Sequence, residues 1–274
     1  MERSNRLDFC LDSLKKKSKK AFVSFTTAGF PDLETFPQIL EGLSSSGVDM
    51  IEIGMPFSDP VADGPVIQEA NLQAFKAGIT VPKILEFVRQ FRTHDKNTPI
   101  ILMGYYNPIY SYGLIRFLDE AQESGVDAFI VPDLPPEEDE EFRLPAKKRN
   151  MHMIRLVTPT SDEARLSVIL DGAKGFLYYV SVTGITGGKT AKTETLREAF
   201  AKIRPLTNLP LAIGFGVSTP EQAHEMAQLA DGVIVGSAIT NKIKENLDDD
   251  GKATKHTVSK TLGFIKSLAR AVHS

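Results

Sequence analysis

The sequence has a single cysteine, no tryptophan and little net charge. Cys10 alone cannot form an internal disulfide or a multi-thiolate metal site, which fits a reducing cytosol. A formal charge of −3 supplies no basic field for nucleic acid or an anionic membrane. No apolar run approaches the ~18 residues of a membrane span, and charges from Glu2 onward argue against a signal peptide. We therefore expect a cytoplasmic protein that binds neither nucleic acid nor membrane, and the scattered histidines suggest no metal site.

What is present is a regular alternation of short β-rich runs and longer helical patterns. The 274 residues, 42% hydrophobic and 24% charged, have the composition of a globular chain and the length of one α/β barrel. We therefore predict the α/β class, with 1–274 forming a single (β/α)8 TIM barrel domain. The eight expected strands are Ala21–Thr27, Val48–Gly54, Pro99–Gly104, Ala128–Val131, His152–Thr158, Gly175–Ser181, Pro210–Gly214 and Gly232–Val235.

An extra amphipathic helix over about Arg3–Lys17 is expected to precede the barrel. Two connections are long, Met55–Thr80 after the second strand and Val182–Glu194 after the sixth. Both follow the carboxyl end of a strand, where barrel active sites lie. The other expected helices are Leu33–Ser46, Val81–His94, Leu114–Ser124, Glu137–Arg149, Ala164–Leu170, Leu196–Ile203, Pro220–Gln228 and Thr257–Val272.

The stretch Ile51–Gln68 carries two carboxylates in contrasting settings. Glu52 interrupts an apolar strand, and a carboxylate is costly to bury there without a partner. Asp63 follows in a loop rich in proline, glycine and aspartate, which a simple surface turn would also explain. Because perturbed carboxylates mark functional sites, we interpret Glu52 and Asp63 as catalytic candidates.

Glycines at three late strand ends predict a phosphate site, the first of them being Thr186-Gly187-Gly188. The other two, Gly214-Phe215-Gly216 and Gly236-Ser237, follow the last two strands, where barrel enzymes commonly bind phosphate through backbone N–H groups. Ser237 is expected to cap a short helix and to donate its hydroxyl to the phosphate. For any single glycine a turn or a helix C-cap is the more ordinary explanation, and it is the three together that favour a phosphate site.

Six sequence blocks are spread over nearly the whole chain. They begin at Glu52-x-Gly54-x-Pro56-Phe57-Ser58-Asp59, Met103-x-Tyr105-x-Asn107-Pro108, Val131-Pro132-Asp133-Leu134-Pro135, Gly184-x-Thr186-Gly187, Gly214-Phe215-Gly216-Val217 and Gly236-Ser237-Ala238-Ile239. Together they resemble the tryptophan synthase α subunit family. The resemblance implies a barrel that cleaves indole-3-glycerol phosphate to indole and glyceraldehyde 3-phosphate without a cofactor of its own. It also implies a pyridoxal-phosphate-dependent β subunit that receives the indole in an αββα heterotetramer.

Position by position, the resemblance gives Glu52 and Asp63 as the catalytic carboxylates. Lys189 stands where many relatives carry an arginine in the loop after the sixth strand, so the closure of that loop is the feature most open to change. The remaining positions are those of substrate binding (Phe25, Tyr178, Thr186, Gly187, Phe215, Gly216, Gly236 and Ser237) and of β-subunit contact (Asp59, Asn107, Asp133 and Pro135).

Two other functions stay open from the residues. One is a different phosphosugar barrel, an isomerase or a lysine Schiff-base aldolase, although no expected strand carries an interior lysine. The other is a subunit that serves mainly to bind and activate the β partner. The presence of both Glu52 and Asp63 favours an enzyme over a purely binding role.

Overall fold

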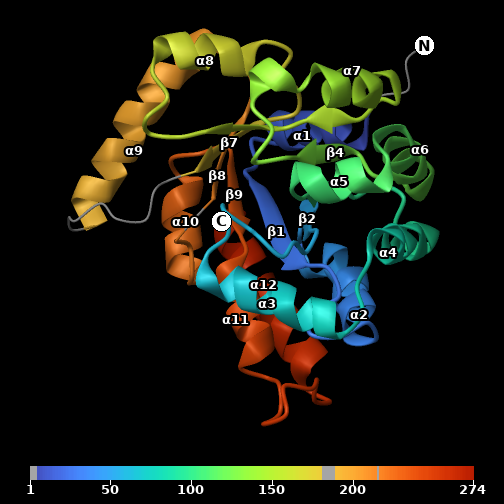
Figure 1. Ribbon diagram of the computed structural model, residues 1–274. Coiled ribbons are helices and arrows are strands. Elements are labelled where there is room, and N and C mark those ends of the chain that lie inside the picture. The colour runs from blue at the N-terminus through green and yellow to red at the C-terminus, as the bar shows by residue number, and fades with distance from the viewer. Residues whose placement is uncertain (1–4, 181–188, 215) are drawn as a thin grey trace.

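The computed structural model describes residues 5–180, 189–214 and 216–274, and its strands form one parallel sheet. The strand order is β5-β4-β3-β2-β1-β9-β8-β7-β6, with helices around the outside (Figure 1). The strands are β1 (Ala21–Thr27), β2 (Met50–Gly54), β3 (Ile100–Met103), β4 (Ala128–Ile130), β5 (His152–Met153), β6 (Arg155–Val157), β7 (Leu177–Val180), β8 (Leu211–Gly214) and β9 (Gly232–Val235).

The sheet closes into a barrel through Ile154, the one residue between β5 and β6. β5 pairs with β4, and the Ile154 backbone N–H donates to the Phe129 carbonyl at 2.9 Å. β6 pairs instead with β7, where Arg155 lies opposite Leu177. The expected fifth strand is therefore one strand that changes partner half-way along, and the predicted (β/α)8 barrel is confirmed.

The helices agree with the predicted ones at most positions and add two. α4, α6 and α12 have the expected bounds, whereas α3 lies inside the segment predicted as a long loop and α5 was not predicted. α9 begins at Lys189, so the end of the second long loop is helical as well. The helices are α1 (Arg6–Lys16), α2 (Thr35–Gly42), α3 (Pro65–Lys76), α4 (Val81–His94), α5 (Tyr106–Tyr112), α6 (Leu114–Ser124), α7 (Glu140–Lys148), α8 (Glu163–Leu170), α9 (Lys189–Ile203), α10 (Pro220–Ala227), α11 (Ser237–Lys244) and α12 (Thr257–Val272), with 3-10 turns at Ser44–Ser46, Pro136–Glu138 and Arg204–Leu206.

The extra helix α1 covers the end of the barrel where the strands begin. Asn5 caps it by accepting from the Leu7 backbone N–H, and its own amide donates to the carbonyls of Asp127 and Asn150. Leu7 and Leu14 are buried against the residues that fill the barrel interior. Within the described ranges, no helix is long and apolar enough to cross a membrane.

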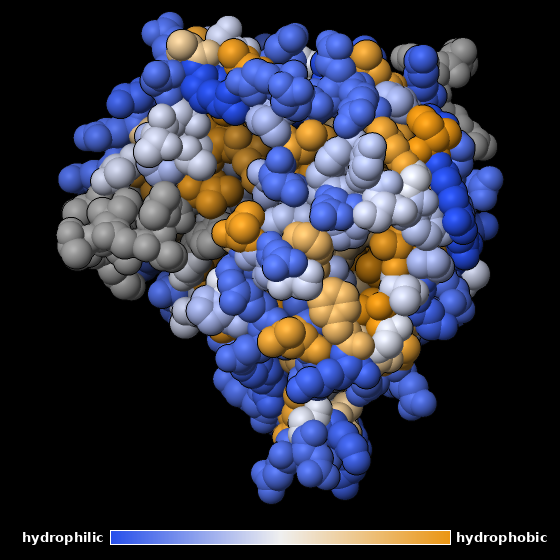
Figure 2. All heavy atoms as spheres, viewed as in Figure 1, coloured by the Kyte–Doolittle hydropathy of each residue, from blue (hydrophilic) through white to orange (hydrophobic). Residues whose placement is uncertain are grey.

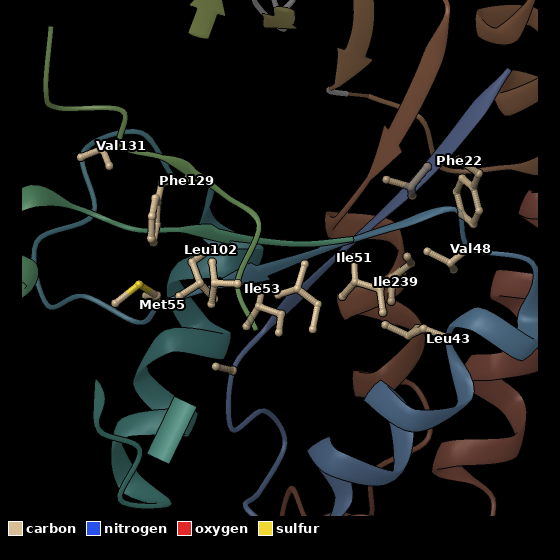
Figure 3. Close-up of a cluster of buried hydrophobic side chains, with 14 of the residues drawn as sticks. Phe22, Leu43, Val48, Ile51, Ile53, Met55, Leu102, Phe129, Val131 and Ile239 are labelled. Carbon is tan, nitrogen blue, oxygen red and sulfur yellow. The ribbon is translucent and has the colours of Figure 1, made fainter. Parts of the chain in front are cut away.

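Alternation along each strand separates two cores. Outward-facing side chains such as Ile51 and Ile53 pack beneath the helices, together with Phe22, Leu102 and Phe129 (Figure 3). Inward-facing side chains fill the barrel, among them Val23, Met50, Ile101, Ala128, Ile130, Ala212 and Ile234. Glu52 is two residues beyond Met50, so it points into the barrel, one layer closer to the carboxyl ends of the strands.

Candidate active site

Glu52 is completely buried within the barrel. Neither of its carboxylate oxygens has a hydrogen-bond partner among the described residues. Burial, as the larger cause, and the negative charge of Asp63, as the smaller one, raise the pKa of Glu52 from 4.5 to about 8. Desolvation disfavours the charged form of an unpaired carboxyl group, so Glu52 carries a proton at neutral pH. It is equipped to act as an acid.

Asp63 lies on the loop before α3, where it is partly exposed. Its Oδ2 accepts a hydrogen bond from the Asn71 amide at 3.2 Å, and the Tyr105 hydroxyl is a second donor. Burial raises the pKa of Asp63 above 3.8, while these two hydrogen bonds oppose the shift. The two carboxyl groups therefore differ as the sequence predicts: one is buried without partners, and the other is held by donors that favour its ionised form.

Phe25 and Tyr178 bring aromatic surface to this layer of the barrel. Phe25 lies opposite Glu52 in the register of β1 and β2. Burial, and next the charge of Glu52, raise the pKa of Tyr178 well above 10, so its hydroxyl stays protonated. Strand-end glycines leave room for both rings: a Cβ on Gly54 would lie 2.5 Å from the Phe25 ring, and one on Gly214 would lie 2.4 Å from Tyr178.

The predicted phosphate residues are only partly within the described ranges. Thr186, Gly187 and Phe215 lie outside them. Gly216 has a φ of +77°, a backbone conformation that favours glycine. Nothing lies within 4 Å of where its Cβ would be, so the space beside its backbone is open. Gly236 and Ser237 are at the start of α11, on the same strand-end edge as the other site residues.

Two details at this helix differ from the expectation. Gly236, not Ser237, is the N-cap residue of α11, and Ser237 is the first helical residue, so Ser237 does not cap the helix. A Cβ on Gly236 would also lie 3.0 Å from the Phe25 ring. Gly236 thus leaves room for the Phe25 ring. It also precedes the first turn of α11, whose backbone N–H groups lack acceptors within the helix.

The four residues expected at the partner surface, Asp59, Asn107, Asp133 and Pro135, are all exposed. Asp133 accepts from the Tyr106 backbone N–H at the start of α5, at 2.9 Å and 3.2 Å to its two oxygens. Apolar side chains are exposed on the neighbouring loop and on α3, including Val61 at 86% and Leu72 at 59%. Figure 2 shows apolar side chains among hydrophilic ones on the face that α3 crosses.

Three contributors to the site have roles that sequence reasoning did not assign, although Gly214 and Tyr105 stand within the motifs named above. Asn71 and Tyr105 contact Asp63, and Gly214 makes room for Tyr178. Asn71 is a buried polar residue on the otherwise apolar face of α3. A polar residue at that position of the helical pattern could have marked it, but α3 was not predicted. Among the described residues, no group of three or more histidine, cysteine, aspartate or glutamate side chains could hold a metal ion.

Comparison with known proteins identifies this arrangement. The family model described as "Tryptophan synthase alpha chain" matches residues 11–270. The chain belongs to the tryptophan synthase α chain family. It is therefore a lyase of tryptophan biosynthesis, whose reaction is the retro-aldol cleavage of indole-3-glycerol phosphate to indole and glyceraldehyde 3-phosphate.

Solved structures support the same assignment. Tryptophan synthase subunit α from Legionella pneumophila str. Paris is 38% identical, with a TM-score of 0.89 over 98% of this chain and 99% of that one. A protein from Aquifex aeolicus VF5 is 38% identical, with a TM-score of 0.87 over 98% and 100% of the two chains. A chain of tryptophan synthase from M. tuberculosis is 29% identical, with a TM-score of 0.85 over 98% and 99%.

Proposed function

We propose that Glu52 is the general acid and Asp63 the electrostatic partner of this cleavage. Indole C3 is a poor carbanion leaving group, so it must first accept a proton and become an indoleninium cation. The carboxyl proton of Glu52 supplies it, because burial keeps this group protonated at neutral pH. That buried, unpartnered carboxyl group is the observation that carries the proposal.

The second step breaks the bond between indole C3 and the glyceryl carbon. The Glu52 carboxylate, now ionised, accepts the proton of the adjacent glyceryl hydroxyl. The C–O bond of that hydroxyl becomes the aldehyde carbonyl, and the electrons of the broken C–C bond neutralise the indoleninium. Asp63 stabilises the positive charge at the indole N–H while it exists. Glu52 regains its proton, so these two reaction steps need no cofactor bound to this chain.

Substrate binding follows from the same layer of the barrel. Phe25 and Tyr178 contact the indole ring, and their buried positions beside Glu52 support this role. We assign the phosphate to backbone N–H groups at Gly216, Gly236 and Ser237, together with Gly187 and Thr186. The start of α11 favours an anion there, because the first N–H groups of a helix lack internal acceptors.

We further propose that indole passes to a pyridoxal-phosphate-dependent β subunit in an αββα heterotetramer in the cytoplasm. The family of this chain implies a β partner. The exposed residues Asp59, Asn107, Asp133 and Pro135 are the proposed contact surface. Asp59 lies on the loop of Asp63, Asn107 lies in the first turn of α5 beside Tyr105, and Asp133 accepts from the Tyr106 backbone N–H, so docking there acts on the elements that hold the site.

The test compares indole release by the wild type with that of Glu52→Gln. The amide keeps the shape of the side chain but cannot supply the proton, so kcat falls by about a thousandfold. Binding of a non-cleavable analogue, measured by calorimetry, stays within about threefold of wild type. Turnover of Glu52→Gln within about tenfold of wild type would rule out Glu52 as the acid.

A further inference from the structure

Tyr105, the residue before α5, contacts the loop that carries Asp63 at two points. Its hydroxyl oxygen accepts from the Ala62 backbone N–H at 2.9 Å, and its O–H donates to the Asp63 carboxylate. We propose that Tyr105 is a positioning residue that fixes both the place and the ionised state of Asp63. This inference rests on the role proposed above for Asp63.

Tyr105 anchors the loop from outside it. In the described part of the chain, the other hydrogen bonds to Ala62 and Asp63 come from Pro60 in the same loop and from Gln68 and Asn71 on α3. Those partners are within eight positions of Asp63 in the sequence. Tyr105 instead belongs to the connection after β3 and lies 43 positions away from Ala62.

Packing holds the Tyr105 ring in place for this task. The side chain is buried, with 3% of its surface exposed, and its ring centre lies 5.1 Å from that of Phe57. Phe57 belongs to the same loop as Asp63. Tyr105 therefore contacts this loop twice, through its ring at Phe57 and through its hydroxyl at Ala62. By contrast Val61, next to Ala62, is 86% exposed. Tyr105 therefore contacts a part of the loop that is itself largely exposed.

Tyr105 also acts on Asp63 electrostatically. A hydrogen bond donated to a carboxylate favours its charged form and lowers its pKa, against the effect of burial. Burial and the neighbouring carboxylates of Asp63 and Asp133 raise the pKa of Tyr105 to about 12, so its hydroxyl remains a donor throughout the working range. Among the described residues, the charge of Asp63 also raises the pKa of Glu52. Removal of the Tyr105 hydroxyl therefore raises the pKa of Asp63.

The same helix start joins this contact to the molecular surface. Tyr106, the next residue, donates its backbone N–H to Asp133, and the residue after it, Asn107, is exposed. Both Asp133 and Asn107 belong to the proposed β-subunit surface. A partner that shifts the first residues of α5 shifts Tyr105 with them, and with it the donor that Asp63 needs.

The test is Tyr105→Phe, which removes the hydroxyl and keeps the ring that packs on Phe57. Tyr112→Phe is the matched control, because it makes the same change at the other end of α5, where the hydroxyl donates to Glu120 at 2.7 Å. We expect Tyr105→Phe to lower kcat at least about tenfold with KM within about threefold. We also expect the acidic limb of its pH–rate profile to move up by about half a unit or more. The control should show neither change.

A second measurement keeps this inference separate from the proposed function. Nuclear magnetic resonance titration of the Asp63 carboxyl carbon follows its pKa in wild type and Tyr105→Phe without any turnover. A higher pKa in the variant supports the inference, even if the wild type releases no indole and the proposed function fails. An unchanged Asp63 titration overturns it, as does a loss of kcat with an unmoved acidic limb, because a purely structural effect would produce that combination.

Discussion

Glu52 lies opposite Phe25 in the parallel register of β2 and β1, with both side chains directed into the barrel. The Phe25 ring occupies the space above Gly54 and Gly236, where a Cβ would approach it to 2.5 Å and 3.0 Å. A proton-bearing carboxyl group and a flat apolar surface are thus neighbours in one layer. This pairing supports the proposed binding of the indole ring against Phe25, with its C3 atom next to the proposed acid.

The two carboxyl groups predict a bell-shaped dependence of kcat/KM on pH. Glu52 must be protonated, so activity is lost as the pH rises through its value of about 8. Asp63 must be ionised, and since its pKa is raised above 3.8, activity is also lost as the pH falls through that raised value. Rates from about pH 4.5 to about pH 9.5 check both limbs. Activity that keeps rising beyond pH 9 would mean that ionised Glu52 is the active form, contrary to its assignment as acid.

Burial of Glu52 also predicts a pH-dependent cost to stability. The folded state binds the proton up to about pH 8, whereas the unfolded chain releases it near 4.5, so stability falls as the pH rises between these values. Glu52→Gln removes that loss. The unfolding free energy of the variant minus that of wild type should grow by up to about 1.4 kcal/mol per pH unit in this window. Urea unfolding at several pH values measures it, and a constant difference would show that Glu52 is not desolvated.

Gly214 should be intolerant of a side chain because of Tyr178. A Cβ at Gly214 would lie 2.4 Å from the ring and hydroxyl of Tyr178, so Gly214→Ala displaces that residue. We expect a loss of about 1–3 kcal/mol in stability and a lower kcat. Gly263→Ala is the control, since nothing lies within 4 Å of a Cβ there and the helical position should gain about 1 kcal/mol. Thermal unfolding measures the stability of the two variants, and indole release measures their kcat. Equal stability of Gly214→Ala and Gly263→Ala would contradict the packing argument.

Asp133 should matter for the partner more than for the isolated chain. Its carboxylate is exposed and holds the start of α5 through the Tyr106 N–H. We expect Asp133→Ala to weaken binding of a β subunit about tenfold or more. Asp171→Ala is the control, because it removes an exposed carboxylate from the loop after α8, at the other end of the barrel. Binding measured by calorimetry decides, and equal affinities for the two variants would exclude Asp133 from the interface.

The strands and the burial of Glu52 within one of them followed from the sequence because both are local patterns. β1 has the predicted bounds, and period-two alternation around Met50 and Ile51 places Glu52 in the barrel. The change of partner at Ile154 could not be predicted, since closure of a barrel depends on how both of its edges meet. It is a property of the whole sheet and not of the five or six residues around it.

The missed helices and contacts have a different cause. α5 is seven residues long and contains Pro108, so it lacks the apolar periodicity that marks longer helices. α3 places Asn71 on its buried face, which weakens the same signal. The hydrogen bond between Ala62 and Tyr105 joins residues 43 positions apart, and only the packed barrel brings them together. The proposed catalytic carboxylates could be predicted from the local strand and loop pattern and from the resemblance, whereas the residues that hold Asp63 could not.

The most direct test of this account is indole release from indole-3-glycerol phosphate by the purified chain, alone and with added tryptophan synthase β subunit. We predict slow release by the chain alone and a rise of at least about tenfold with the partner, because docking at Asn107 and Asp133 orders the elements that hold Asp63. Absence of release from folded protein under both conditions would contradict the catalytic roles of Glu52 and Asp63. The chain would then be a subunit that binds and activates its partner without cleaving the substrate.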